Sequence, residues 1–230
     1  MEQALIFEFV GTALMILLGL GVVANVVLPQ TKGHGSGWVV ITFAWGFAVF
    51  VGAYVAQPSG AHLNPAVTLG LTLAGQFEGN VFGYIVAQMC GGMFGAFLMY
   101  FFYKPHFDLT DNPDDKLGVF CTIPAVRSYG YNFLSEFIAT YVLVIGILFA
   151  SQSQIAGPFP VGILIAAIGM SLGGTTGYAM NPARDLAPRI VHFFMPIKGK
   201  RDSDWAYSWV PLLGPLCGGI LAGLTYAFVI

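Results

Sequence analysis

The chain has 230 residues, of which 57% are hydrophobic and only 9% are charged, and its mean hydropathy is +0.76. Water-soluble domains carry about 25% charged residues. This composition therefore leaves too few charges to cover a water-facing surface, and lipid must form part of the solvent. The formal net charge is −2 with no basic stripe, which excludes nucleic acid as an expected partner.

Six apolar stretches are long enough to cross a bilayer, because a spanning helix needs about 20 apolar residues. Trp38, Trp205 and Trp209 fall near the ends of these stretches, where tryptophan is typical of the membrane interface. The predicted spans cover roughly residues 4–28, 37–57, 82–103, 132–152, 159–176 and 206–228.

Two further apolar segments are too short to cross the membrane. One runs from Pro65 to Leu73, and the other begins at Pro182 and ends near Val191. A helix of about ten residues rises only about 15 Å, which is half of the hydrocarbon core. The sequence therefore predicts two re-entrant half-helices.

The two halves of the chain share short motifs in the same order. The first span contains Glu-Phe-Val-Gly-Thr at residues 8–12, and the fourth contains Glu-Phe-Ile-Ala-Thr at 136–140. Asn-Pro-Ala follows in each half, at 64–66 and 181–183. Because each half has three spans, an odd number, the second half enters the membrane from the opposite side, and paired broken helices in such a repeat point to a conduction or binding site. The predicted organisation is one all-α membrane channel domain over 1–230, with inverted repeats 1–103 and 132–230 joined by a partly ordered loop, 104–131.

Each Asn-Pro pair is typical of a helix start. Asparagine is among the best N-cap residues, and proline suits the first helical position because its missing N–H would have no partner there. If the side-chain oxygens of Asn64 and Asn181 accept helix N–H groups, both hydrogens of each amide point outward as donors. Each helix start also carries roughly half a positive charge, so two starts facing one constriction repel cations and hinder proton hopping. One such pair would be an ordinary cap or turn, but two copies at matching places indicate function.

Residues 59–68 (Ser-Gly-Ala-His-Leu-Asn-Pro-Ala-Val-Thr) and 177–185 (Gly-Tyr-Ala-Met-Asn-Pro-Ala-Arg-Asp) closely resemble the two signature loops of the aquaporins, the major intrinsic protein family. The resemblance covers nearly the whole chain. It implies six tilted spans, two half-helices meeting at the midplane, and a homotetramer with one pore per subunit. Within the family the chain is similar to the aquaglyceroporin branch of bacterial glycerol facilitators. That likeness implies a passive channel for glycerol and water in the cell membrane, with no enzymatic activity and no cofactor or metal.

Four residues match the outer filter of that family. Gly169, Tyr178 and Arg184 match directly, and Trp45 matches if one residue is deleted before Asn64 relative to the usual pattern. Trp45 and Tyr178 would face the carbons of glycerol, Arg184 would donate to its hydroxyls, and Gly169 would leave room that a histidine fills. The alternative for Arg184 is a side chain that extends to the interface, but a charge inside a membrane segment is usually functional.

The resemblance also assigns roles to the segments around the two motifs. The pore centre is expected at Asn64, Pro65, Ala66, Asn181, Pro182 and Ala183. Ladders of backbone carbonyl acceptors are expected from Gly60, Ala61, His62, Leu63, Gly177, Tyr178, Ala179 and Met180, because irregular backbone is tolerated where it lines a wet cavity.

Four further polar residues admit two interpretations each. Glu8 and Glu136 could form a proton relay, but their repeat symmetry favours carboxylates that accept backbone N–H groups and support the adjacent loops. Asp185 is an acid in the first turn of a half-helix, where the dipole favours it, and a salt bridge that holds the loop is the second possibility. His62 is expected to anchor its loop by hydrogen bonds rather than to bind a metal, since no second ligand is near in sequence.

The main rival is a secondary transporter, which also uses inverted repeats and broken helices but needs a coupling site; no acidic cluster lies on the half-helices. A membrane enzyme would need a nucleophile–base pair or a metal cluster, and none stands out. Solutes that fit such a filter besides glycerol and water are dihydroxyacetone, urea, hydrogen peroxide and neutral lactic acid. The resemblance implies cytoplasmic termini. That orientation opposes the positive-inside tendency, since it places these cations outside: Lys32, Lys104, Lys116, Arg127, Lys198, Lys200 and Arg201.

Overall fold

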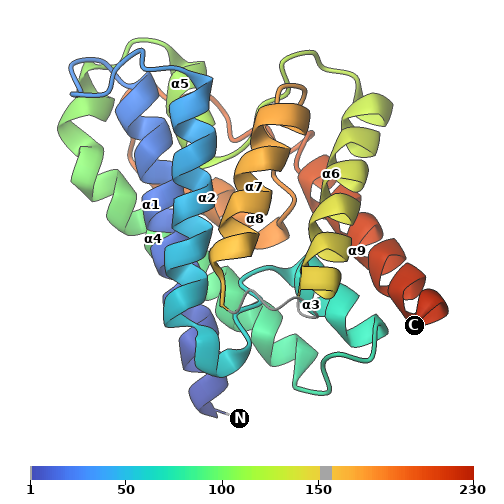
Figure 1. The fold of residues 1–230 in the computed structure, drawn as a ribbon. Helices are drawn as coiled ribbons and strands as arrows, with labels where there is room; N and C mark the ends of the chain where they lie inside the picture. Colours follow the sequence, from blue (N-terminus) through green and yellow to red (C-terminus); the bar gives the residue numbers. More distant parts are fainter. Residues whose placement is uncertain (1, 151–156) are drawn as a thin grey trace.

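The computed structural model describes residues 2–150 and 157–230, and within these ranges its regular elements are all helices. This agrees with the predicted all-α fold class. In Figure 1 the two chain ends lie toward the same end of the molecule, opposite the short helix α5. The elements are α1 (Glu2–Val27), α2 (Trp38–Val55), the 3₁₀ turn η1 (Gln57–Ser59), α3 (Pro65–Leu73), α4 (Val81–Leu109), α5 (Pro113–Phe120), α6 (Tyr129–Ala150), α7 (Phe159–Leu172), α8 (Pro182–Phe194) and α9 (Trp209–Val229).

Five of the six predicted spans are helices of membrane-crossing length in the described part of the chain: α1, α2, α4, α6 and α9. The remaining predicted span, 159–176, corresponds to α7, which is shorter than predicted. It has 14 residues and ends at Leu172, where Gly173 and Gly174 follow, and glycine is a poor helix former. Residues 151 and 152, where the fourth predicted span ends, lie outside the described residues.

The segment 104–131 is more helical than a loop. Helix α4 continues to Leu109, and α5 follows at Pro113. The Asn112 side chain accepts a hydrogen bond from the Asp114 N–H at 3.1 Å, which caps α5. Proline in the first helical position and acids in the first turn add to this start. The short helix is therefore encoded by its local sequence, but a search for apolar membrane-spanning stretches does not detect it because its hydropathy is low.

Close packing between the long helices depends on glycine. A Cβ at Gly91 in α4 would lie 2.3 Å from the carbonyl oxygen of Phe9 in α1, and a Cβ at Gly218 in α9 would lie 2.3 Å from that of Phe137 in α6. Glycine is the residue that permits such an approach of two backbones. The two contacts occupy matching places in the two halves, so α4 crosses α1 as α9 crosses α6.

Candidate functional site

Both half-helices begin with the predicted asparagine cap. The Oδ1 of Asn64 accepts a hydrogen bond from the Ala66 N–H at 2.8 Å, and that of Asn181 accepts one from the Ala183 N–H at 2.9 Å. Both asparagines have extended backbone, as expected for an N-cap. Since proline follows each cap, the first helical position has no N–H that would need an acceptor.

Each asparagine amide also reaches across to the other half of the chain. The Nδ2 of Asn64 donates to the Met180 carbonyl at 2.8 Å, and the Nδ2 of Asn181 donates to the Leu63 carbonyl at 2.9 Å. The sequence prediction that both amide hydrogens face the pore is therefore corrected to one hydrogen per asparagine. The two helix starts are joined to each other through these bonds.

The backbone before each cap is strained at matching positions. Ala61 and Leu63 have φ of 55° and 53°, and Tyr178 and Met180 have φ of 37° and 49°. Residues other than glycine rarely adopt this left-handed region; each costs about 1–3 kcal/mol and persists only where the surroundings impose it. Alternation of left-handed residues turns successive carbonyl groups away from regular secondary structure.

Glu8 is one of the groups that impose this conformation. It is fully buried in α1, and its carboxylate accepts hydrogen bonds from the His62 N–H at 2.9 Å and the Leu63 N–H at 2.8 Å. The Ser59 hydroxyl and the Gln88 amide also donate to it, at 2.7 and 2.8 Å. The carboxylate therefore satisfies the donors that the irregular loop exposes.

Glu136 makes the equivalent contacts in the second half. It is fully buried in α6 and accepts hydrogen bonds from the Ala179 N–H at 3.0 Å and the Met180 N–H at 2.8 Å. The Thr176 hydroxyl donates to it at 2.6 Å. Thr176 stands five residues before its asparagine, as Ser59 does, so the hydroxyl donors repeat as well.

Arg184 and Trp45 lie against each other. Arg184 is in the first turn of α8 and is 8% exposed, and its Cζ atom lies 4.3 Å from the centre of the Trp45 ring on α2. This is a cation–π contact. Among the described residues, no protein group accepts a hydrogen bond from Nη1 of Arg184. The guanidinium thus combines an aromatic support with a donor that is available to a solute.

Tyr178 and Gly169, the other two filter residues, are also in contact. A Cβ at Gly169 would lie 2.8 Å from Cζ of the Tyr178 ring. The room expected beside Gly169 is therefore occupied by the tyrosine ring, and in the described part of the chain Gly169 itself does not line the pore cavity. Glycine here admits the ring rather than the solute.

A cavity of about 450 Å³ connects these groups. Trp45, Tyr178 and Arg184 line it together with both asparagines, Asn64 and Asn181. Since a water molecule takes up about 30 Å³ in the liquid, the cavity is large enough for several waters or a small polyol. Other described lining residues include Met15, Val49, Gly60, Ala61, His62, Leu63, Val67, Leu143, Ile165, Ala179 and Met180. Seven of the eight predicted ladder residues line the cavity, and Gly177 is the exception.

Comparison with known proteins agrees with this geometry. The family model described as major intrinsic protein matches residues 1–226. The chain belongs to this family. A probable glycerol uptake facilitator protein of Thermotoga maritima is 57% identical over 224 residues, which are 95% of this chain and 96% of the relative. A D/L-lactic acid transporter of Lactiplantibacillus plantarum is 41% identical over 96% of this chain and 95% of its own.

A solved structure places the fold within the same family. The aquaglyceroporin of Plasmodium falciparum superimposes with a TM-score of 0.87 and 33% sequence identity, covering 98% of this chain and 95% of its own. The predicted aquaporin-like fold and the predicted family are confirmed. As a major intrinsic protein the chain is a multi-pass membrane protein and not an enzyme.

Asp185 forms a buried ion pair in this member of the family. Its Oδ1 lies 2.7 Å from Nη2 of Arg189, and neither side chain is more than 1% exposed. Its Oδ2 accepts hydrogen bonds from the backbone N–H and the hydroxyl of Thr122, at 2.7 and 2.6 Å. Both interpretations of Asp185 fit these contacts, because it lies in the first turn of α8 and forms a salt bridge with Arg189 of the same helix. The hydrogen bonds from Thr122 tie α8 to the segment after α5.

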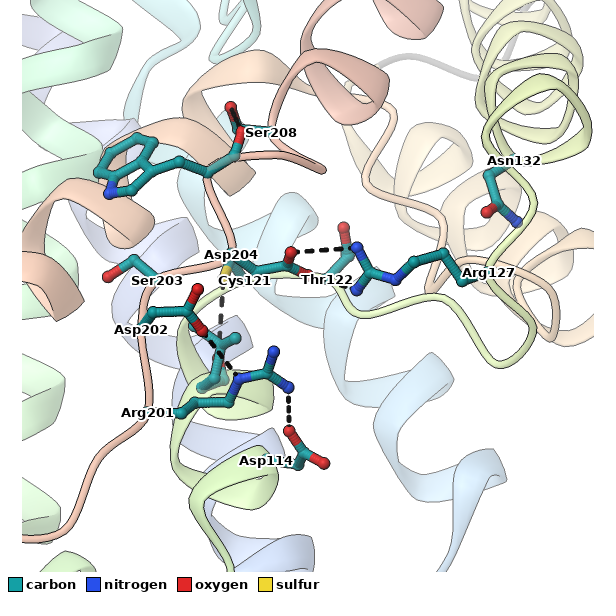
Figure 2. Close-up of polar contacts among 12 residues, drawn as sticks. Asp114, Cys121, Thr122, Arg127, Asn132, Arg201, Asp202, Ser203, Asp204 and Ser208 are labelled. Atoms are coloured by element: carbon teal, nitrogen blue, oxygen red, sulfur yellow. Dashed lines mark hydrogen bonds and ion pairs between the residues drawn. The ribbon is translucent and has the colours of Figure 1, made fainter.

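The connecting segments on the same side of the molecule as α5, around residues 121–128 and 195–208, are here called the outer connections, and a second ion pair holds them together (Figure 2). The Arg127 guanidinium meets the Asp204 carboxylate through two hydrogen bonds, of 3.0 and 2.5 Å. These bonds raise the pKa of Arg127 above its usual value, so the pair stays charged. Arg201 pairs with Asp114 in the same region. The segments before α6 and before α9 are therefore joined on one side of the molecule.

Several cations in the outer connections have partners within the protein. Nζ of Lys116 donates to the Lys198 carbonyl at 2.6 Å. Nζ of Lys200 donates to three carbonyls at the end of α8, at 2.6–2.8 Å: those of His192, Phe193 and Met195. A cation is favourable at a helix C-terminus. These lysines therefore complete the fold of the outer connections.

His62 lies within its loop as a hydrogen-bonded residue. Its Nδ1 is 3.1 Å from the Thr68 hydroxyl, and its ring packs edge-on against Phe77 with 4.5 Å between ring centres. Gly177 is not among the described residues that line the cavity, and a Cβ there would lie 3.3 Å from Thr122.

Sequence reasoning missed the partners of the predicted residues. Ser59, Thr176 and Gln88 donate to the two glutamates, and Arg189 pairs with Asp185. A signal existed for two of them, because Ser59 and Thr176 stand at the same distance before Asn64 and Asn181. Gln88 and Arg189 carry no such repeat signal.

The contacts of Glu136 lead to a prediction about its replacement by glutamine. The amide oxygen can accept from one side only, so the amide nitrogen faces at least one backbone N–H of Ala179 or Met180. A buried donor left unpaired costs about 1–3 kcal/mol. We expect Glu136→Gln to lower the thermal stability of the purified protein while solute flux stays independent of pH, as in the wild type. A wild-type proton current that this change abolishes would instead establish a proton relay.

Proposed function

We propose that this protein is a passive channel for glycerol, water and other small uncharged solutes, and that it excludes ions and protons. The observation that carries the proposal is the continuous cavity that joins the Trp45, Tyr178 and Arg184 filter to the two asparagine caps. The names of the similar facilitators and of the similar aquaglyceroporin support glycerol as the solute.

The filter suits a molecule with one apolar and one hydroxyl edge. The Trp45 and Tyr178 rings face the carbons of glycerol, and Arg184 supplies the donor that has no protein acceptor. Carbonyls of the two left-handed loops accept from the hydroxyls as the solute advances. At the pore centre, the remaining hydrogen on each amide of Asn64 and Asn181 donates to the solute or to water.

The organisation of the chain follows from the same proposal. Residues 1–230 form one channel domain in which inverted repeats 1–103 and 132–230 are joined by the segment 104–131. The matching contacts of Glu8 and Glu136 and of Gly91 and Gly218 support this symmetry. We further propose a homotetramer in a bacterial cell membrane with cytoplasmic termini.

Dihydroxyacetone, urea, hydrogen peroxide and neutral lactic acid are further proposed solutes, since all are small and uncharged. The relative named as a D/L-lactic acid transporter supports the last of these. Light-scattering rates of proteoliposomes across this panel test the proposal. A channel gives fast, non-saturating flux with a low activation energy and no ion dependence, whereas a secondary transporter saturates and needs a coupling ion.

The contact between Gly169 and Tyr178 leads to a prediction about selectivity. A Cβ at Gly169 would lie within 3.0 Å of Tyr178 and Thr42, so Gly169→His must displace the tyrosine ring toward the pore. We expect the glycerol permeability to fall by about tenfold or more, which corresponds to a permeation barrier raised by about 1.4 kcal/mol or more. The water permeability should fall much less, because water is smaller than glycerol and passes the displaced ring more easily.

Gly174 offers a matched control for that change. A Cβ there would meet no atom within 4 Å, so Gly174→His adds the same side chain near the end of α7 without moving Tyr178. Its glycerol-to-water permeability ratio should equal that of the wild type. Equal losses of both solutes in Gly169→His would contradict the filter assignment.

A further inference from the structure

Trp38, the first residue of α2, has contacts that an interfacial anchor does not need. It is 41% exposed, as Trp205 and Trp209 are at 40% each, and exposure alone gives all three the same role. However, Nε1 of Trp38 donates a hydrogen bond to the Gly169 carbonyl at 3.1 Å. Its ring meets the Tyr178 ring edge to face, with centres 5.7 Å apart and an angle of 84°.

These contacts enclose the Tyr178 ring. A Cβ at Gly173, one turn after Gly169, would lie 2.4 Å from Cδ1 of Tyr178 and 3.0 Å from Trp38. The ring therefore lies in a slot whose floor is Gly169, in the last turn of α7, and Gly173, directly after this helix, and whose side is Trp38. The Gly169 carbonyl belongs to the last turn of α7, where carbonyls lack intrahelical donors, so Trp38 also secures that floor.

The Tyr178 ring is held in place by few polar contacts. Among the described residues, the Tyr178 hydroxyl has no hydrogen-bond partner. Its backbone is left-handed, with φ of 37°, and it lines the cavity beside Arg184. The ring position consequently depends on apolar contacts, of which the edge-to-face contact with Trp38 is one. Such aromatic pairs add stabilisation beyond the area that they bury.

We propose that Trp38 is a positioning residue for solute selectivity, which holds the Tyr178 ring against α7 and out of the solute path. The inference rests on the proposed channel function. When Trp38 is absent, the Tyr178 ring is free to turn into the cavity that it lines. Glycerol is wider than water, so glycerol is obstructed first and the ratio of the two permeabilities falls.

The test uses Trp38→Ala and Trp38→Leu in purified, reconstituted protein. Leucine retains an apolar side chain at the membrane interface, so Trp38→Leu decides the question if Trp38→Ala does not insert. Glycerol and water permeabilities are measured by stopped-flow light scattering on the same vesicles, so their ratio is independent of protein yield. We expect the ratio to fall by about fivefold or more in both variants, where about fivefold is the lower end of the effect of losing one aromatic pair and one hydrogen bond.

Two further variants separate positioning from a general structural role. Trp205→Leu removes an equally exposed tryptophan that packs on Phe193, and its ratio should stay at the wild-type value. In protein that already carries Tyr178→Leu, adding Trp38→Leu should not lower the glycerol-to-water permeability ratio any further.

The outcomes separate this role from the channel function. The role of Trp38 is overturned if the glycerol-to-water permeability ratio of Trp38→Leu is unchanged or raised. It is also overturned if Trp205→Leu lowers this ratio equally, or if Trp38→Leu lowers it as much in the Tyr178→Leu background as in the wild type. Wild-type vesicles without glycerol flux overturn the proposed function instead.

Discussion

Replacing Arg184 with valine should open the pore to protons and small cations while water flux persists. The guanidinium lies 4.3 Å from the centre of the Trp45 ring, and both side chains line the cavity. Unit charges 4 Å apart interact by about 4 kcal/mol at an effective dielectric of 20. Because each 1.4 kcal/mol is tenfold, the Arg184 charge suppresses a passing cation by up to roughly a thousandfold. The two capped helix starts add a smaller repulsion at the pore centre.

Planar-bilayer current and a pH-sensitive dye inside proteoliposomes measure this leak. Arg201→Val is the matched control, because Arg201 is also an outer arginine but pairs with Asp114 outside the cavity lining. The proton and cation leak of Arg201→Val should be no greater than that of the wild type. If the proton and cation leak of Arg184→Val is no greater than that of the wild type, the Arg184 charge is not a main barrier. The helix starts and the cost of dehydration would then exclude these ions.

Replacing Arg189 with methionine should cause a large loss of stability. The change removes the ion pair with Asp185 and also the hydrogen bonds from Arg189 to the carbonyls of Ser203, at 2.7 Å, and Thr122, at 3.2 Å. It leaves the Asp185 carboxylate buried without its cation. Breaking a buried pair in this way costs about 3–5 kcal/mol, which lowers the melting temperature by roughly 10 °C for a chain of this size.

Arg127→Met is the comparison for this change. Arg127 also pairs with an aspartate, but its side chain is 36% exposed, and solvent-screened pairs contribute about 1 kcal/mol or less. A double change, Asp185→Asn with Arg189→Met, removes the unpaired charge and should recover part of the stability. Light scattering monitors the thermal unfolding of the two single variants and the double variant in detergent, and their melting temperatures are compared with that of the wild type. Equal losses in Arg189→Met and Arg127→Met would show that burial does not govern the cost.

Features that depend on nearby residues could be predicted from the sequence. Asn64 and Asn181 cap their helices through bonds to the second residue after each of them, so the half-helix starts follow from local chemistry. The repeat of Glu8 and Glu136 at matching positions indicated equivalent carboxylates. The helix α5 could also have been found, since Asn112, Pro113 and Asp114 form a cap signal of the same kind.

Features that depend on distant pairs could not be predicted. Arg127 and Asp204 are 77 residues apart, and Trp38 and Gly169 are 131 apart. Trp38 at a span end has the same sequence signature as Trp205, although only the first of these two contacts Tyr178. The orientation of the asparagine amides was missed for the same reason, because the Met180 and Leu63 carbonyls that accept from them belong to the opposite repeat.

The reciprocal bonds of the two asparagines bear on how the chain is assembled during synthesis. Asn64 and its acceptor, the Met180 carbonyl, are separated by 116 residues, so the first half-helix leaves the ribosome long before its counterpart exists. Until then the Asn64 amide and the Leu63 carbonyl must be satisfied by water, because unpaired backbone groups are not tolerated in hydrocarbon. The hydrogen bonds that join the first half-helix to the second therefore form only after the second has been made. Closure of the pore centre is a late, long-range step of biogenesis, and neither repeat can complete it alone.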